Sequence, residues 1–229
     1  MGVIKYPEIK PVSSYSEFKD SLRETLKRID LSKGISPEAT RQLDMLLAGL
    51  NFGDPEFQKL IVLDEEKDRK LKARGSLLAP LEFFGDNKEV GLLLVAYDKG
   101  GVTPAHKHNG RAYRYENFRI IDGEVTTDTW GEVAGSEQVV NGETFVRLKV
   151  LGSEIQTAAV NAVYREPKSD QDIHQPRNAS QEKPAKLVLL FVQDSNVSSM
   201  EKGDRQKNLA FTNYSPLTVA DVKTKNLPV

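Results

Sequence analysis

The histidines are the residues of this chain whose spacing is most typical of metal chemistry. The sequence holds only three of them, and two, His106 and His108, are separated by a single residue. Because side chains alternate between the two faces of a strand, residues i and i+2 point the same way, so these two imidazoles are predicted to converge. The third, His174, lies in a later β-rich stretch. Three imidazoles around one point suit a transition metal such as Fe(II), Zn, Ni or Mn.

Glu116 is the first carboxylate after the histidine pair and the candidate for a fourth metal ligand. Two other roles are open to it. It can accept a hydrogen bond from a metal-bound imidazole, or it can form a salt bridge with Arg111, Arg114 or Arg119. A closed four-ligand site with Glu116 bound would be a structural Zn site, whereas a site with an open position can bind a substrate.

Tyr113 and Tyr115 stand between the histidine pair and Glu116. One of them is a candidate catalytic residue that supplies a phenol hydroxyl at the metal; the alternative is ordinary packing of aromatic residues on a strand. Asn178 follows His174 after three residues. It is a candidate to hold the metal ligands in place without binding the metal itself. Asn side chains also commonly stabilise turns, which is the alternative role.

Residues 1–75 are predicted to be a helical region. Ser14 or Ser16 can cap a first helix, because a serine hydroxyl accepts a hydrogen bond from an unpaired backbone N–H of the first turn. Ser36-Pro37 is a start signal for a second helix, and Asp54-Pro55 opens a third helical segment. The apolar residues of the first two stretches recur at helical spacing, so we expect these helices to pack on the outside of a barrel.

The pattern changes to strands from residue 76, and the expected β-barrel extends to residue 193. Short apolar runs with Gly-rich turns between them are typical of a sandwich or barrel. Residues 194–229 are expected to form a loop, an edge strand and a loose tail. The principal strands are expected at Leu81–Phe84, Val90–Tyr97, Arg111–Ile121, Glu124–Trp130, Phe145–Leu151, Ala158–Tyr164, Ile173–Gln175 and Leu187–Val192.

The histidine region resembles the first motif of the cupin superfamily. In that motif a Gly is followed by five residues and a His-x-His pair, then by a Glu and, after six intervening residues, a second Gly. Gly100, His106, His108, Glu116 and Gly123 match these positions, although the gap before the Glu is longer here than in the family. The resemblance implies a cupin jelly-roll barrel, a double-stranded β-helix, with a metal held by the two histidines, a third histidine and the Glu.

The end of the second cupin motif, a His followed after three residues by an Asn, is matched by His174 and Asn178. The order of elements is most similar to the cysteine dioxygenase type of thiol dioxygenase, in which a helical N-terminal region leads into the barrel. That resemblance implies Fe(II) as the metal, with Zn, Ni or Mn as the other candidates. It also implies a small-molecule substrate and O₂ as the partners.

Two positions depart from the thiol dioxygenase pattern. The arginine that binds the substrate carboxylate in that family falls on Pro80, and the catalytic tyrosine of its closing strand falls on Phe191. By sequence, the candidates to replace the arginine are Arg111, Arg114 and Arg165. We therefore expect weak turnover or none of cysteine and 3-mercaptopropionate, and a less polar thiol or another small anionic chelator as the substrate.

Composition limits the other classes of function. The 229 residues carry 32 basic and 33 acidic side chains. With the charges balanced, the sequence predicts no net electrostatic attraction to nucleic acid or to a membrane surface. The chain has no cysteine, which excludes disulfides and a Cys–Tyr crosslink. Neither a signal-peptide pattern nor a membrane-length apolar run is found. We expect a cytoplasmic protein, with a secreted form that has lost its signal as the alternative; a homodimer is left open.

These observations favour a non-haem Fe(II) dioxygenase that acts on a small thiol or other small anion. Two alternatives stay open. One is a cupin lyase or isomerase that uses its metal as a Lewis acid. The other is a cupin that binds a metal or a small molecule without catalysis. Large side chains that fill the barrel would support this alternative.

Overall fold

The structure is a computed structural model. It describes residues 3–6, 14–61, 71–73, 75–85, 88–103, 113–135, 138–140, 143–145, 148–165 and 173–194. None of the helices in these ranges is both long enough and apolar enough to cross a membrane.

The helices lie in the first part of the chain, as the sequence predicts. They are α1 (Tyr15–Lys27), α2 (Pro37–Gly49) and α3 (Pro55–Ile61), with a 3-10 turn at Leu31–Lys33. The Ser14 hydroxyl accepts a hydrogen bond from the Glu17 backbone N–H at 3.1 Å, and the Ser36 hydroxyl accepts one from Ala39 at 3.1 Å. Both serines are therefore N-caps, which satisfy donors that the first helical turn cannot pair internally.

Strands form the rest of the described chain. They are β1 (Val3–Lys5), β2 (Leu71–Ala73), β3 (Ser76–Gly85), β4 (Lys88–Tyr97), β5 (Tyr113–Asp122), β6 (Glu124–Glu132), β7 (Gln138–Val140), β8 (Glu143–Phe145), β9 (Leu148–Thr157), β10 (Ala162–Arg165), β11 (Ile173–Arg177) and β12 (Ala185–Asp194). A seven-stranded sheet has the order β1-β10-β5-β12-β4-β3-β2, and a three-stranded sheet has the order β11-β6-β9. β7 and β8 pair with each other.

The strand order is that of a jelly roll. Neighbours within each sheet come from distant parts of the chain: β12 lies between β4 and β5 in one sheet, and β11 pairs with β6 in the other. An isolated antiparallel bridge joins Val102 to Arg177, so the chain that follows β4 crosses to the outer edge of β11. Crossing between two antiparallel sheets in this way is the jelly-roll pattern, and it confirms the predicted fold class.

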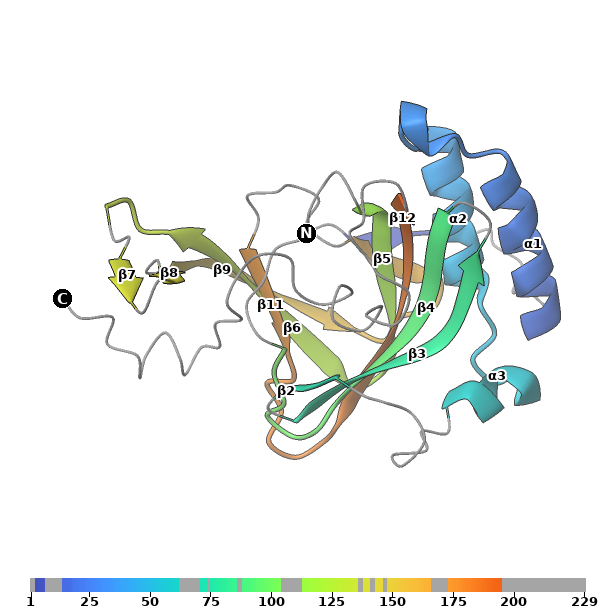
Figure 1. The fold of residues 1–229 in the computed structure, drawn as a ribbon. Coiled ribbons are helices and arrows are strands. Elements are labelled where there is room, and N and C mark those ends of the chain that lie inside the picture. The colour runs from blue at the N-terminus through green and yellow to red at the C-terminus, as the bar shows by residue number, and fades with distance from the viewer. Residues whose placement is uncertain are drawn as a thin grey trace.

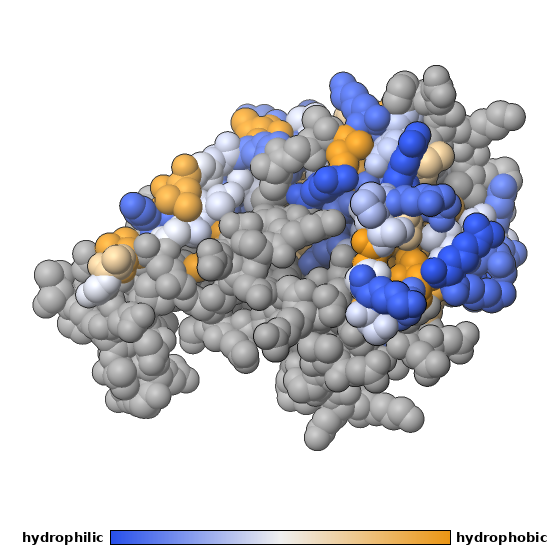
Figure 2. Space-filling view, turned by 90° about the horizontal axis from the view of Figure 1, so that it is seen from above, coloured by the Kyte–Doolittle hydropathy of each residue, from blue (hydrophilic) through white to orange (hydrophobic). Residues whose placement is uncertain are grey.

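The seven-stranded sheet lies between the helices and the smaller sheet (Figure 1). It separates two hydrophobic cores. One core lies between its outer face and the helices, and includes Phe18 and Leu47 from α1 and α2 with Leu92 and Leu190 from the sheet. The other lies on its inner face, and Val125 of the smaller sheet belongs to it. The helices thus pack outside the barrel, and most residues on the solvent side of α1 are hydrophilic (Figure 2).

Two local features differ from the sequence prediction. The region predicted to be helical, residues 1–75, also contains two strands: β1 pairs antiparallel with β10, and β2 pairs antiparallel with β3 at the other edge of the large sheet. The strand predicted over Ala158–Tyr164 starts only at Ala162, because the chain turns at Asn161, which has a positive φ of 54°. Short polar residues such as Asn adopt this conformation more readily than others, and residue-type patterns alone did not mark the turn.

Candidate metal centre

Strand β5 presents different residues to the two faces of the large sheet. Residues paired across neighbouring antiparallel strands share a face, and Phe118 and Ile120 pair with Leu189 and Leu187, which are all in the inner core. Glu116 pairs with Phe191, another member of the inner core, so its side chain points into the barrel. It is 9% exposed. The predicted acidic ligand therefore faces the barrel interior.

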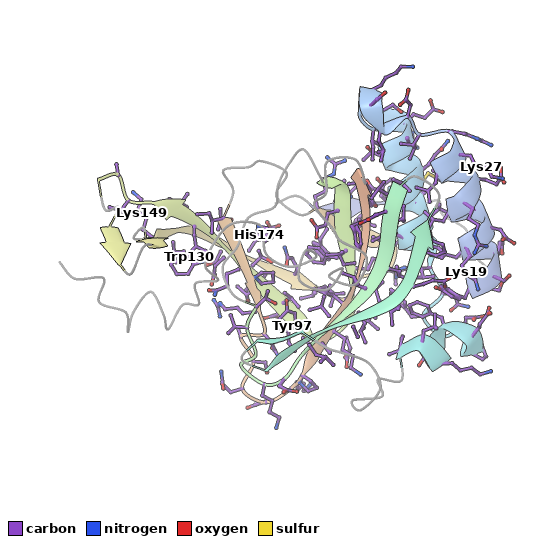
Figure 3. The ribbon with its side chains drawn as sticks, in the orientation of Figure 1. Lys19, Lys27, Tyr97, Trp130, Lys149 and His174 are labelled. Atoms are coloured by element: carbon purple, nitrogen blue, oxygen red, sulfur yellow. The ribbon has the colours of Figure 1, made fainter. Side chains whose placement is uncertain are left out.

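His174 faces the interior from the opposite sheet. It lies on β11 and pairs with Thr129 of β6, on the same face of that sheet as Val125 of the inner core. Figure 3 shows His174 on the side of β11 toward the large sheet and Trp130 on the other side. The His174 side chain is 1% exposed. A nearly fully buried imidazole and a nearly buried carboxylate thus approach the interior from two sheets.

The two residues also lie at the same level of the barrel. β5 and β6 are consecutive strands joined at Gly123. Glu116 precedes the end of β5 at Asp122 by six residues, and Thr129, the partner of His174, follows the start of β6 at Glu124 by five. At about 3.3 Å per residue, both lie roughly 16–20 Å from this turn. The position of His174 relative to Glu116 is therefore suitable for a shared site.

The chain that leads to the histidine pair runs beside β11. The Thr103 N–H donates to the Pro176 carbonyl at 2.9 Å, and the Asn178 N–H donates to the Gly101 carbonyl at 2.8 Å. The Thr103 hydroxyl is 3.0 Å from the hydroxyl of Tyr97, an inner-core residue, so Thr103 faces inward. Because the pairing is antiparallel, the direction of the chain at Thr103 is toward the level of His174.

Asn178 holds this arrangement together. Its side-chain amide donates to the backbone carbonyls of Asp98 at 3.0 Å and Lys183 at 2.6 Å, and its side-chain carbonyl accepts from the Ser180 N–H at 3.0 Å. All three contacts are with backbone groups of turns, as the turn role predicts. Asn178 therefore joins the loop before Thr103 to the loop that follows β11, the strand of His174.

The outer face of β5 carries a closed polar cluster, which we call the Asp44 cluster: Asp44, Tyr6, Tyr115, Asn117 and Arg165. Asp44 lies on α2 and has no exposed surface. Its carboxylate accepts hydrogen bonds from the Tyr115 hydroxyl at 2.9 Å, the Tyr6 hydroxyl at 2.8 Å and the Asn117 amide. An Arg165 nitrogen lies 3.8 Å from it. Burial raises the pKa of Tyr115 well above its ordinary value, and the adjacent Asp44 charge adds to this.

This cluster separates Tyr115 and Arg165 from the barrel interior. Tyr115 was a candidate catalytic residue and Arg165 a candidate substrate anchor, yet both contact Asp44 on the helix-covered face, opposite Glu116. The structure therefore does not bring these two residues to His174. The physical reason is strand parity: Tyr115 is adjacent in sequence to Glu116, so the two side chains must point to opposite faces.

Arg119 is also on the helix side, which excludes it as the salt-bridge partner of Glu116. Its guanidinium donates to the carbonyls of Leu47 and Leu50 at 3.1 Å each, and to that of Ala48, at the C-terminal end of α2. It also lies 4.4 Å from the centroid of the Phe52 ring. The last carbonyls of a helix lack the donor that an internal turn supplies, so the arginine caps this end of α2, together with the Leu50 N–H, which donates to the Leu47 carbonyl at 3.4 Å. Burial lowers the pKa of Arg119 to about 10.

Several predicted site residues fall outside the described residues. They are His106, His108 and Arg111, together with the side chains of Tyr113 and Arg114, whose backbone belongs to β5. Within the ranges that are described, no group of three or more His, Cys, Asp or Glu side chains is placed to hold a metal. His174 and Glu116 are the predicted ligands whose positions the structure gives.

The sequence reasoning missed Asp44 and Asn117, and it considered Arg119 only as a salt-bridge partner of Glu116. A signal was present in the alternation of Tyr115, Asn117 and Arg119, which puts three polar residues on one face of the strand. Such a face must meet polar partners when it is buried. The partner, Asp44, is more than 70 residues away in sequence, and nothing in the local pattern identifies it.

Comparisons with known proteins add little to this geometry. No protein-family model matches the chain, and no curated protein matches it either. Solved structures that share a likeness include a Thermus thermophilus protein at 18% identity over 59% of this chain and 92% of that chain, with a TM-score of 0.35. Recombinant oxalate oxidase in complex with glycolate matches at 18% identity over 74% of this chain and 75% of that chain, with a TM-score of 0.36.

A third likeness is to KdgF from Halomonas sp., at 13% identity over 62% of this chain and 94% of that chain, with a TM-score of 0.33. An RmlC-like cupin from Shewanella frigidimarina matches at 14% identity over 59% of this chain and 91% of that chain, with a TM-score of 0.29. At such low identities and scores, these likenesses carry no argument about activity, metal or substrate. The fold assignment rests on the strand order itself.

Proposed function

We propose that this protein is a metal-dependent cupin, and that His106, His108 and His174 hold an Fe(II) ion with Glu116 as a fourth ligand or as a hydrogen-bond partner of a bound imidazole. The observation that carries the proposal is the placement of His174 and Glu116. They face the barrel interior from two sheets at the same level. The chain toward the histidine pair starts beside β11.

The proposal requires a particular backbone course between Thr103 and His106, which lies outside the described residues. Thr103 faces inward, so strict alternation would send residues 105 and 107 inward and the two histidines outward. An inward histidine pair therefore requires one extra residue, a β-bulge, between Thr103 and His106. Pro104 stands at this point, and proline, which cannot donate a ladder hydrogen bond, is tolerated at bulges. Bulges are also common beside active sites.

The donor set fits a redox-active metal with an open position. Three neutral imidazoles leave the charge of a divalent ion uncompensated, which favours an anionic substrate such as a thiolate, while a bound Glu116 would lower the net charge by one. When bound, iron would supply electron transfer between the substrate and O₂. The protein would orient the ligands and exclude water with the apolar side chains of the inner core.

The inner face also bears on the substrate. Among the described inward side chains of β4, β5, β10 and β12, none is Lys or Arg. Bidentate Arg–carboxylate pairing is a strong anchor, so a substrate carboxylate would need an arginine from outside this described set. Arg111 and Arg114 are the candidate anchors whose side chains lie outside the described residues. We propose a small, less polar thiol or another small anionic chelator as the substrate.

The test is O₂ uptake by protein loaded with Fe(II) under anaerobic conditions, with cysteine, 3-mercaptopropionate, cysteamine and propanethiol as substrates and His174→Ala as the control. We expect thiol-dependent uptake with the less polar thiols and weak or no uptake with cysteine and 3-mercaptopropionate. Fast, saturable uptake with cysteine would contradict the substrate proposal. Metal binding with no O₂ uptake by any thiol or anionic chelator would contradict the dioxygenase proposal and favour Lewis-acid chemistry.

A further inference from the structure

Three residues on neighbouring strands form one row across the inner face of the large sheet. Phe191 of β12 pairs with Gly91 of β4 on one side and with Glu116 of β5 on the other. Paired residues share a face of the sheet, and Phe191 belongs to the inner core. The residue between the glycine and the carboxylate is therefore a large aromatic ring that can lean toward either neighbour.

The ring leans onto Gly91. A Cβ atom placed on Gly91 would be 2.1 Å from Cε1 and 2.3 Å from Cζ of Phe191, closer than real contacts allow. The backbone of Gly91 therefore forms the floor on which the ring lies, and close approach of another group is a common reason for glycine inside a strand. Because β4 and β5 flank β12 on opposite sides, this position takes the ring away from the strand that carries Glu116.

We propose that Gly91 is a positioning residue of the metal centre: by accepting the Phe191 ring, it keeps the space beside the Glu116 carboxylate open for the metal and its ligand. This inference rests on the proposed function. The ring, which lies over Gly91, then forms an apolar wall on the far side of this space from Glu116, so the part of the ligand that does not touch the metal would be uncharged. A side chain at position 91 would push the ring toward Glu116, since the glycine side would be closed.

The experiment measures binding of Co²⁺, as a coloured substitute for Fe(II), by absorption titration of the full chain. Four proteins form a cycle: wild type, Gly91→Ala, Phe191→Leu and the double variant. We expect Gly91→Ala to weaken Co²⁺ binding by about tenfold in the wild-type background, within the usual range of coupling between residues in contact. In the Phe191→Leu background the same substitution should change binding by less than about threefold, because the smaller side chain can move without covering Glu116.

Gly152→Ala is the matched control. Gly152 lies on β9, and a Cβ added there meets nothing within 4 Å. It should leave both the affinity and the Co²⁺ spectrum unchanged. Circular dichroism melts of each variant show whether the titrated protein is folded, so a loss of affinity in folded protein reports on the site and not on stability.

The outcomes separate the inference from the proposed function. If wild type does not bind Co²⁺ in folded protein, the metal centre is wrong and the inference is overturned with it. If wild type binds and Gly91→Ala binds equally well, or if its loss is the same in the Phe191→Leu background, only the inference is overturned. If Gly91→Ala alone does not fold, the double variant decides: folding with Co²⁺ affinity close to that of Phe191→Leu supports the inference, and any other result overturns it.

Discussion

The two faces of strand β5 carry polar residues for different purposes. On the face toward the helices, Tyr115 and Asn117 contact the Asp44 carboxylate, and Arg119 caps the end of α2. On the inner face, Glu116 is the described polar residue of the strand and is followed by Phe118 and Ile120. The outer polar groups thus meet their partners on one helix, while Glu116 and His174 point into the barrel interior from two different sheets.

We infer that the polar residues on the outer face of β5 stabilise the fold, whereas Glu116 on the inner face serves binding. Buried polar groups that bond within one tight cluster fix the position of an element, here α2 against β5. Ionisable groups that approach one interior point from separate sheets are positioned to hold something between them. The outer substitutions should therefore change stability without changing metal binding, and the inner ones should change metal binding much more than stability.

Asp44→Ala tests the outer face and should have the largest effect. It leaves the Tyr115 hydroxyl and the Asn117 amide buried without their acceptor, so we expect a loss of about 3–5 kcal/mol in the free energy of unfolding. Urea denaturation followed by circular dichroism measures it. Asp20→Ala on the solvent side of α1 is the control and should change little, because its pair with Arg23 is exposed. A loss of Co²⁺ affinity in folded Asp44→Ala would contradict the claim that the outer face of β5 does not affect metal binding.

His174→Ala tests the inner face. It removes one of three imidazole ligands, and we expect Co²⁺ affinity to fall by at least about 100-fold, since even residues behind metal ligands cost 10–100-fold. The fold should be retained, with a loss of stability of about 1–2 kcal/mol for a truncated buried side chain. Absorption titration and a thermal melt give the two readings. Unchanged affinity in the folded variant would place the metal elsewhere or exclude it.

Glu116→Gln distinguishes the roles left open for this carboxylate. The change keeps the shape of the side chain and removes its charge. If Glu116 is a ligand or supports one, Co²⁺ affinity should fall by about tenfold, at the low end of the range for groups that tune metal ligands. The d–d spectrum should shift only if the carboxylate is bound. Wild-type affinity and spectrum together would assign Glu116 to a contact unrelated to the metal.

Tyr115→Phe should have the smallest effect of the four. It removes one of the hydrogen bonds to Asp44, so we expect a loss of about 1 kcal/mol in the free energy of unfolding. Neither metal affinity nor O₂ uptake should change. A large loss of O₂ uptake with normal metal content would restore the catalytic role that the sequence suggested for this phenol.

The sequence predicted the parts of this molecule that depend on local rules. Ser14 and Ser36 are caps because a serine before a helical stretch satisfies the first-turn donors whatever lies around it. The β-barrel class followed from short apolar runs and turns. Long-range contacts were not predictable in this way. The pairing of β1 with β10, and the choice of Asp44 as the partner of Tyr115, depend on which segments meet in space.

The alternation of side chains along β5 determines which of the candidate site residues point into the barrel. Glu116 and Tyr115 were both candidates, yet adjacent residues on a strand cannot both face the interior. The register with β12 shows that Glu116 is the inward one. A sequence gives the alternation but not its phase, because both faces of β5 are buried and neither is marked by solvent exposure.

Diffraction from crystals of the iron-loaded protein, with anomalous data collected at the iron absorption edge, tests the central claim most directly. The account predicts one peak per chain inside the barrel, at about 2.0–2.2 Å from nitrogens of His106, His108 and His174, which is the usual length of metal–imidazole bonds. It also predicts a bulge between Thr103 and His106. A fully loaded crystal with no peak at His174, or with the side chains of His106 and His108 on the opposite face of the sheet from His174, would contradict it.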